Sequence, residues 1–187
     1  MIFCAEMSTK NDITGKTDIT SNSVSRKDFD AAVKTILKCF VGVTELNKHQ
    51  DNALLRLIHR HDVFAVLPTG FGKSLIFQLL PSLCRELNLM GYDSFPENCV
   101  VVVICPLVAL IESHINELKK RGIACACLSG ISQQDKTDVL DGKYSFIFTN
   151  PETIVMNEKW REMLQNPVYQ KRLFAIVTDE AHVIPKW

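Results

Sequence analysis

The sequence predicts an α/β fold in which a doubly wound, mainly parallel sheet is flanked by helices. Apolar runs of strand length alternate with stretches of helical periodicity along the 187 residues. The run at 99–104, Cys-Val-Val-Val-Val-Ile, is continuously apolar, which is typical of a strand covered on both faces. Right-handed crossovers then bring the carboxyl ends of the parallel strands to one edge of the sheet, which we call the carboxyl edge.

One folded domain is expected over residues 26–187, after a segment, 1–25, that is predicted to be disordered. The first helix is expected to begin after Ser25, an N-cap with Asp28 three residues further on. Residues 85–98 are predicted to form a surface loop. The other expected strands are 63–67, 123–128, 144–149 and 174–178, and the other expected helices are 48–59, 75–80, 107–121, 132–140 and a helical region that starts at Pro151.

The composition limits the classes of partner. Lys+Arg and Asp+Glu both number 21, so the net formal charge is zero and any contact with nucleic acid has to be local. The helix at 107–121 is expected to end at Gly122 as its C-cap. The three cations in its last turn, Lys119, Lys120 and Arg121, are compatible with such a local patch or with complementing the helix dipole. Seven cysteines without C-x-x-C spacing indicate reduced, mostly buried thiols of an intracellular protein. No apolar run is long enough to span a membrane, so no membrane partner is expected.

The chain is organised around residues 67–74, Leu-Pro-Thr-Gly-Phe-Gly-Lys-Ser, which we call the phosphate loop. Because the loop lies between a predicted strand and a predicted helix, its backbone N–H groups are expected to bind a polyphosphate. Lys73 is expected to reach the β- and γ-phosphates, and the Ser74 hydroxyl to bind Mg²⁺. An ordinary strand–helix connection is the alternative, because Leu67 replaces the first glycine of the strict pattern. The residues expected around the phosphates are Thr69, Gly70, Phe71, Gly72, Lys73 and Ser74.

A second element, Asp-Glu-Ala-His at 179–182, directly follows the predicted strand at 174–178. A carboxylate at the carboxyl end of a buried parallel strand lies where α/β sheets bind ligands. Asp179 is therefore expected to bind Mg²⁺, and Glu180 to accept a proton from an attacking water. A surface pair that caps a helix is the alternative. Together with the phosphate loop, this element indicates a domain that binds a nucleoside triphosphate.

Four stretches of the sequence carry a resemblance to a known family. The phosphate loop continues as Leu-Ile-Phe-Gln-Leu-Leu-Pro over 75–81. Residues 103–110, Val-Ile-Cys-Pro-Leu-Val-Ala-Leu, are similar to motif Ia, and 148–152, Phe-Thr-Asn-Pro-Glu, are similar to motif Ib. The Asp-Glu-Ala-His element matches motif II, and Trp187 falls where an aromatic-rich loop has its first tryptophan. Together and in this order, they resemble the first RecA-like domain of superfamily 2 DNA helicases of the RecQ-like group.

The resemblance implies a P-loop NTPase domain of RecA-like fold that forms the ATP-binding lobe of an ATP-dependent 3'-5' DNA helicase. Such a lobe couples ATP hydrolysis to strand separation in DNA repair or recombination. The implied cofactors are ATP and Mg²⁺, the implied partner is single-stranded or forked DNA, and the implied location is intracellular, in the nucleus. The residues implied to contact the strand, or to couple it to the nucleotide, are Pro106, Leu107, Thr149, Asn150, Pro151, His182 and Trp187.

The nucleotide-reading motif of that family is incomplete here. Gln50 is present, but Val43 and Asn47 stand where an aromatic residue and an arginine are usual. We therefore expect only a weak preference for ATP over GTP. Gln50 has a second interpretation, as the partner of an Asn47 N-cap in a capping box, and both interpretations remain open. The other departures are Cys105, where motif Ia usually has serine, and the inserted Asn150.

The sequence ends at Trp187, within the aromatic-rich loop of the family that it resembles. Helicases of this type have a second RecA-like domain that supplies arginines to the transferring phosphate, and we expect this partner domain to be missing. An arginine finger is worth roughly 10³–10⁵ in rate in related systems. We therefore expect the chain alone to bind ATP without unwinding DNA. A non-catalytic nucleotide- or partner-binding fragment and an RNA helicase lobe remain alternative functions.

Overall fold

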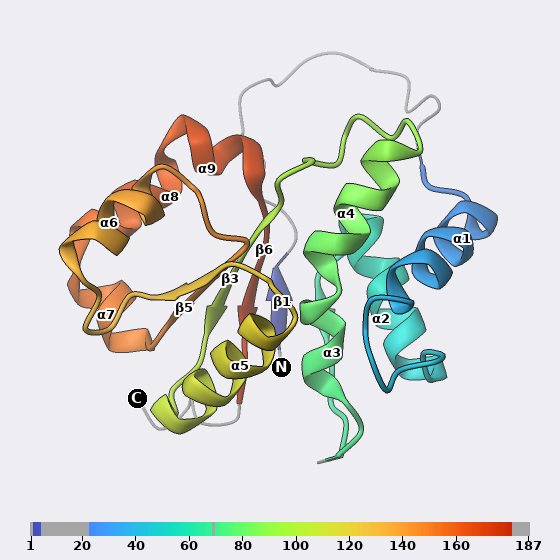
Figure 1. The fold of residues 1–187 in the computed structure, drawn as a ribbon, viewed down its shortest axis with the longest axis horizontal. Coiled ribbons are helices and arrows are strands. Elements are labelled where there is room, and N and C mark those ends of the chain that lie inside the picture. The colour runs from blue at the N-terminus through green and yellow to red at the C-terminus, as the bar shows by residue number, and fades with distance from the viewer. Residues whose placement is uncertain (1, 5–22, 69, 181–187) are drawn as a thin grey trace.

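The computed structural model describes residues 2–4, 23–68 and 70–180, and it arranges them around a six-stranded sheet (Figure 1). The strands lie in the order β2-β1-β6-β3-β5-β4. Their bounds are Ile2–Cys4 for β1, Val63–Phe64 for β2, Val100–Ile104 for β3, Cys125–Cys127 for β4, Phe146–Thr149 for β5 and Leu173–Thr178 for β6.

The strand directions confirm a mainly parallel sheet. β3 pairs in parallel with β5 and β6, and β4 pairs in parallel with β5. β1 is antiparallel to both β6 and β2, so β2 points in the same direction as the parallel strands. The phosphate loop after β2 and Asp179 after β6 therefore leave the sheet at the same carboxyl edge, with β1 between their strands.

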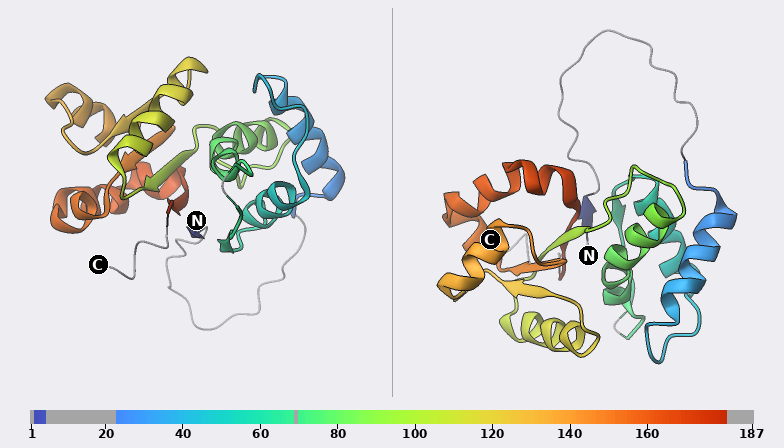
Figure 2. Two further views of the ribbon diagram at one scale, coloured as in Figure 1. Left: turned by 90° about the horizontal axis from the view of Figure 1, so that it is seen from below. Right: turned by 45° about the horizontal axis from the view of Figure 1, so that its top comes forward.

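Helices cover both faces of the sheet, as the doubly wound class requires. In Figure 1, α1 to α4 lie on one side of the sheet and α6 to α9 on the other, and the views in Figure 2 agree. One hydrophobic core contains Val101 and Val103 of β3, and the other contains Val100 and Val102, because alternate residues of a strand face opposite sides. The helix bounds are α1 Arg26–Leu37, α2 Lys48–Ile58, α3 Lys73–Gln78, α4 Leu80–Leu89, α5 Val108–Lys120, α6 Gln133–Leu140, α7 Pro151–Met156, α8 Glu158–Gln165 and α9 Pro167–Arg172.

Capping residues confirm the predicted starts of three helices and the predicted end of a fourth. The side chains of Ser25, Asn47 and Asn150 accept backbone N–H bonds at the starts of α1, α2 and α7. After α5, Gly122 has a φ of +71°, and its N–H donates to Lys119 O at 3.0 Å. A glycine in this left-handed conformation is a common way to end a helix.

Two predictions about local structure are wrong in part. α4 extends to Leu89, so the predicted loop at 85–98 is helical at its start. Pro81 follows the end of α3 at Gln78, as expected, and lies in the first turn of α4, where its missing N–H is tolerated. Disorder was predicted for 1–25, but residues 2–4 form β1, whose backbone pairs with a strand on each side. Three residues are too few for a periodic pattern.

The cations at the end of α5 favour the structural interpretation. Arg121 donates to Gln78 Oε1 at 2.9 Å and to Glu117 Oε1 at 2.8 Å, and its guanidinium lies over the Phe40 ring at 4.8 Å. α5 starts after β3 at the carboxyl edge, so its end lies at the opposite edge.

Among the described cysteines, Cys84, Cys99, Cys105 and Cys125 are buried free thiols, whereas Cys39 is exposed. No helix in the described ranges is long and apolar enough to cross a membrane.

Candidate functional site

The phosphate loop makes a tight turn between β2 and α3. Gly70 and Gly72 have φ angles of +85° and +69°, in the left-handed region that favours glycine. An ideal Cβ at Gly72 would lie 2.5 Å from Gln50 Nε2, whereas nothing lies within 4 Å of one at Gly70. Between them, Phe71 is 48% exposed, and its N–H donates to Pro68 O at 3.3 Å. The two glycines therefore let the backbone adopt a turn that other residues would strain.

Lys73 and Ser74 lie at the start of α3, directly after this turn. Lys73 Nζ donates to Leu67 O at 2.9 Å, so the side chain reaches from the start of α3 back to the first residue of the phosphate loop. Both side chains are half-buried. Thr69, which was also predicted to belong to the site, lies outside the described residues.

Gln50 fastens the phosphate loop to α2. Its Oε1 accepts the Asn47 N–H at 3.0 Å, which completes the capping box of α2. Its Nε2 donates to Phe71 O at 3.2 Å and to Gly72 O at 3.1 Å. Asn47 Nδ2 adds a longer bond of 3.4 Å to Phe71 O. With an exposed fraction of 6%, Gln50 is a buried polar residue whose amide oxygen and both amide protons form hydrogen bonds.

The capping interpretation of Gln50 is therefore confirmed, and its role in reading adenine stays a prediction. Both amide protons are donated to loop carbonyls, so Gln50 would have to give up these bonds to reach a base. Val43 is partly buried against the core and offers no stacking surface of the aromatic kind. This geometry gives a physical reason for the expected weak preference for ATP.

Asp179 follows β6 at the carboxyl edge and is 4% exposed. Its Oδ1 accepts the Glu180 N–H at 2.9 Å, and its Oδ2 lies 3.4 Å from His114 Nε2 on α5. Burial raises the pKa of Asp179, but the hydrogen bonds from His114 and Glu180 outweigh burial, so the net pKa is lowered. The carboxylate is therefore ionised at neutral pH, the form that binds a divalent cation.

Two neighbours of Asp179 complete this corner of the site. Glu180 has a φ of +50°, and backbone strain of this kind, about 1–3 kcal/mol, is concentrated at functional sites. Burial, together with the carboxylates of Asp179 and Glu180, raises the pKa of Cys105 to about 11. Cys105 is therefore a neutral thiol at physiological pH. His182 and Trp187, which were predicted to couple nucleotide and DNA, lie outside the described residues.

Backbone hydrogen bonds beyond the strand ends hold the loop starts side by side. Asp179 N–H donates to Ile104 O at 2.8 Å, and Cys105 N–H donates to Thr149 O at 2.9 Å. The carboxyl ends of β6, β3 and β5 are thereby tied together in that order. The segments predicted to face a DNA strand, at 106–107 and 149–151, consequently lie next to Asp179. We call the Asp-Glu-Ala-His stretch that begins there the acidic element.

The residues predicted to face a DNA strand differ in how exposed they are to solvent. Leu107 is 51% exposed, whereas Pro106, Asn150 and Pro151 are half-buried. Thr149 is fully buried, and its hydroxyl donates to Asn150 O at 3.1 Å. A contact between the Thr149 hydroxyl and a DNA strand would therefore require this bond to break.

A comparison of sequences shows the family of the chain. The sequence model of the DEAD/DEAH box helicase family matches residues 47–187. The chain belongs to this family. A match of this extent covers the phosphate loop, the acidic element and every strand-facing segment between them.

Similar helicases are of the RecQ type, which confirms the resemblance. ATP-dependent DNA helicase Q1 of Rattus norvegicus is 28% identical over 183 residues, which cover 93% of this chain and 27% of that protein. ATP-dependent DNA helicase RecQ of Synechocystis sp. is 34% identical over 136 residues, 70% of this chain and 25% of that protein. ATP-dependent DNA helicase Q-like SIM of Arabidopsis thaliana is 33% identical over 168 residues, 88% of this chain and 18% of that protein. The chain thus spans 18–27% of the length of these helicases.

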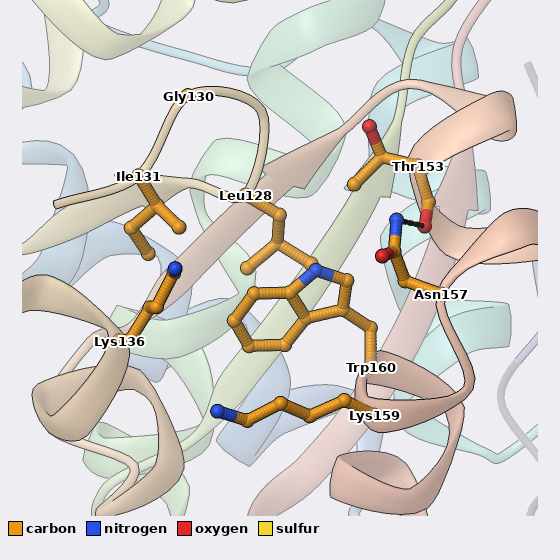
Figure 3. A pocket seen from close by; sticks show the side chains of 8 residues that line it. All are labelled: Leu128, Gly130, Ile131, Lys136, Thr153, Asn157, Lys159 and Trp160. Carbon is orange, nitrogen blue, oxygen red and sulfur yellow. Dashed lines mark hydrogen bonds between the residues drawn. The ribbon is translucent and has the colours of Figure 1, made fainter. Parts of the chain in front are cut away.

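A cavity of about 290 Å³ opens at the β4 end of the carboxyl edge of this helicase domain (Figure 3). Figure 3 shows Lys136 and Lys159 on two sides of the Trp160 indole. Neither ammonium forms an ion pair with a carboxylate in the part of the chain that the structure describes. The residues that line the cavity are Leu128, Gly130, Ile131, Lys136, Thr153, Asn157, Lys159 and Trp160.

The cavity and His114 were both missed by sequence reasoning. The two lysines lie on different helices, so no local pattern links them. His114, by contrast, carried a usable signal, because it occupies the inward face of α5 between the buried Ile111 and Leu118. A polar residue at an apolar position of a helix needs a polar partner.

We expect Gly72→Ala to lower the free energy of unfolding by about 1–3 kcal/mol more than Gly70→Ala does. Both variants have the strain of a positive φ, but only the Cβ at Gly72 displaces the Gln50 amide and breaks its two bonds to the loop, each worth roughly 0.5–1.5 kcal/mol. Chemical denaturation measures both values. In a Gln50→Ala background the difference should disappear; a difference that persists there would mean that Gln50 does not hold the loop.

Proposed function

We propose that this chain is the ATP-binding lobe of a RecQ-like, ATP-dependent 3'-5' DNA helicase that couples ATP hydrolysis to strand separation in DNA repair or recombination. The observation that carries the proposal is the common carboxyl edge, from which the phosphate loop, Asp179 and the strand-facing segments all leave. The names of the similar proteins, ATP-dependent DNA helicases, support DNA as the substrate. The polarity rests on the RecQ-like resemblance.

The residues of the site fit a nucleoside triphosphate with Mg²⁺. Gly70 and Gly72 supply a turn without side chains of its own at these two positions, and Lys73 would exchange the Leu67 carbonyl for a phosphate oxygen. The Ser74 hydroxyl and the ionised Asp179 carboxylate are oxygen ligands, which Mg²⁺ prefers. When bound, the ion would neutralise charge on the β- and γ-phosphates.

Glu180 serves as the general base in this proposal. It accepts a proton from the water whose oxygen attacks the γ-phosphorus, while the bond from that phosphorus to the bridging oxygen breaks and ADP leaves. Asp179 and Glu180 divide the two roles because their surroundings differ. Two donors hold the buried Asp179 carboxylate, whereas Glu180 is half-buried and follows the strand in a left-handed conformation.

A DNA strand would lie along the carboxyl edge, from Leu107 past Asn150 to the cavity beside Lys136 and Lys159. A chain of zero net charge attracts phosphates only through local cations, and these two lysines have no carboxylate partner among the described residues. Backbone contacts of this kind position a strand without reading its sequence. His182 and Trp187 would couple the strand to the nucleotide, as the resemblance implies.

The proposed partner is a second RecA-like domain that closes over the nucleotide, and the proposed location is intracellular, in the nucleus. Both rest on the RecQ-like resemblance of the sequence, and the chain spans 18–27% of the length of the similar helicases. In this proposal the arginines that neutralise the developing charge on the γ-phosphate belong to that partner domain. Unwinding by the chain alone is therefore not expected.

We expect Lys136→Ala/Lys159→Ala to weaken binding of single-stranded DNA. It should also reduce the slope of log K against log salt by about 1.4, since each lost phosphate contact removes roughly 0.7. Fluorescence anisotropy of a labelled oligonucleotide, titrated at several salt concentrations, measures both effects. Lys27→Ala/Lys34→Ala on α1 is the matched control, because it removes the same charge far from the cavity. If both double variants bind alike, the strand does not reach the cavity; tighter binding of RNA than of DNA would favour the RNA helicase alternative.

We expect Glu180→Gln to bind ATP as tightly as the unchanged chain does. Its rate of ATP hydrolysis should be about 10²–10⁴-fold lower than that of the unchanged chain, because an amide accepts no proton. Lys73→Ala should instead lose nucleotide binding itself, since it removes the ammonium that reaches the phosphates. Calorimetric titration with MgATP and a phosphate-release assay separate these outcomes. Equal loss of ATP binding in both variants would contradict the role assigned to Glu180.

A further inference from the structure

His114 lies where the phosphate-loop helix, the strand leading to Thr149 and the acidic element meet. It belongs to α5 and is 8% exposed. Its ring stacks on Phe148 of β5, with centroids 5.9 Å apart and planes at 13°. Phe77 of α3 meets the same ring edge-on, at 5.4 Å and 79°. Two aromatic rings from different elements therefore fix the plane of the imidazole.

The fixed imidazole directs Nε2 at the Asp179 carboxylate, 3.4 Å from Oδ2. An ionised carboxylate only accepts hydrogen bonds, so Nε2 carries the proton. The distance of 3.4 Å exceeds the usual N–H···O distance, about 2.7–3.2 Å, so this hydrogen bond is weak and the two packed rings are what keep Nε2 facing the carboxylate. Oδ1 is held by the Glu180 N–H at 2.9 Å. Each carboxylate oxygen thus has one protein donor and keeps a lone pair for another ligand.

We propose that His114 is a positioning residue that fixes the Asp179 carboxylate in the orientation that binds Mg²⁺. The inference rests on the proposed function, in which Asp179 and Ser74 both bind the ion of MgATP. His114 contacts the elements of both expected Mg²⁺ ligands. It faces Asp179 directly, and Phe77, which packs on its ring, belongs to α3, the helix that begins with Lys73 and Ser74. Partners that orient a metal ligand are part of the site, since a carboxylate that rotates freely binds a metal less tightly.

The test compares ATP binding with and without Mg²⁺. For each variant, calorimetric titration gives the Kd for ATP in EDTA and in excess Mg²⁺, and their ratio is the gain from Mg²⁺. His114→Leu keeps an apolar side chain in the core but has no donor, and we expect it to reduce the gain about 10- to 100-fold. The Kd in EDTA should not change, because the phosphate-loop contacts do not involve Asp179. His114→Gln retains a terminal N–H donor and should keep most of the gain.

A packing role would give the opposite order, because leucine suits the apolar surroundings of Phe77 and Phe148 better than glutamine does. If thermal unfolding shows that His114→Leu is not folded, His114→Asn replaces it, since its amide donor is one methylene shorter and should not reach Asp179. An undiminished gain in His114→Leu, or an equal loss in the glutamine variant, would overturn the inference and leave the proposed function intact. No gain from Mg²⁺ in the unchanged chain would overturn the proposed function as well.

Discussion

Backbone hydrogen bonds beyond the ends of the parallel strands hold the whole site in register. They join Asp179 N–H to Ile104 O, Cys105 N–H to Thr149 O and Leu128 N–H to Phe148 O. These bonds continue the parallel ladder past the point where each strand becomes a loop. Each loop can therefore differ in chemistry while its starting point stays fixed. The acidic element, the Pro-Leu segment, the capped helix α7 and the lysine-lined cavity follow one another along the edge for this reason.

The buried carboxylate of Asp179 is the electrostatic consequence of this arrangement. Burial alone disfavours its charge, and the donors from His114 and Glu180 reverse that effect, so the folded-state pKa lies below the usual value. A group with a lowered pKa stabilises the fold above its unfolded pKa, and that contribution is lost as the pH falls through the folded pKa. The interactions that keep the site ionised at neutral pH thus also stabilise the fold there.

Local patterns predicted the parts of this protein that local chemistry determines. The phosphate loop, the strand β3 and the caps at Ser25, Asn47 and Gly122 each follow from residues close together in the sequence. The predicted loop at 85–98 is helical at its start, because Pro81, which follows the end of α3, is also compatible with the first turn of a further helix. β1 could not be predicted, because three residues show no periodicity and its stability comes from pairing with β6 and β2.

The contacts that sequence reasoning missed join residues far apart in the chain. Gln50 was assigned a cap or a nucleotide contact, but its bonds to Phe71 and Gly72 depend on how α2 packs against α3. His114 meets Asp179 only because α5 returns over the sheet to the position of the residue that follows β6. Lys136 and Lys159 share a cavity through the placement of α6 and α8. Such pairings are set by topology, which the spacing of residues in one segment does not record.

The central claim is that the phosphate loop and the acidic element hold one divalent ion together with ATP. Electron paramagnetic resonance of Mn²⁺, which replaces Mg²⁺ on oxygen ligands, tests it most directly on residues 1–187. We predict protein-bound Mn²⁺ that requires ATP and that is lost in both Ser74→Ala and Asp179→Asn, although these residues lie on different sides of β1. Mn²⁺ bound with undiminished affinity in either variant would contradict the account.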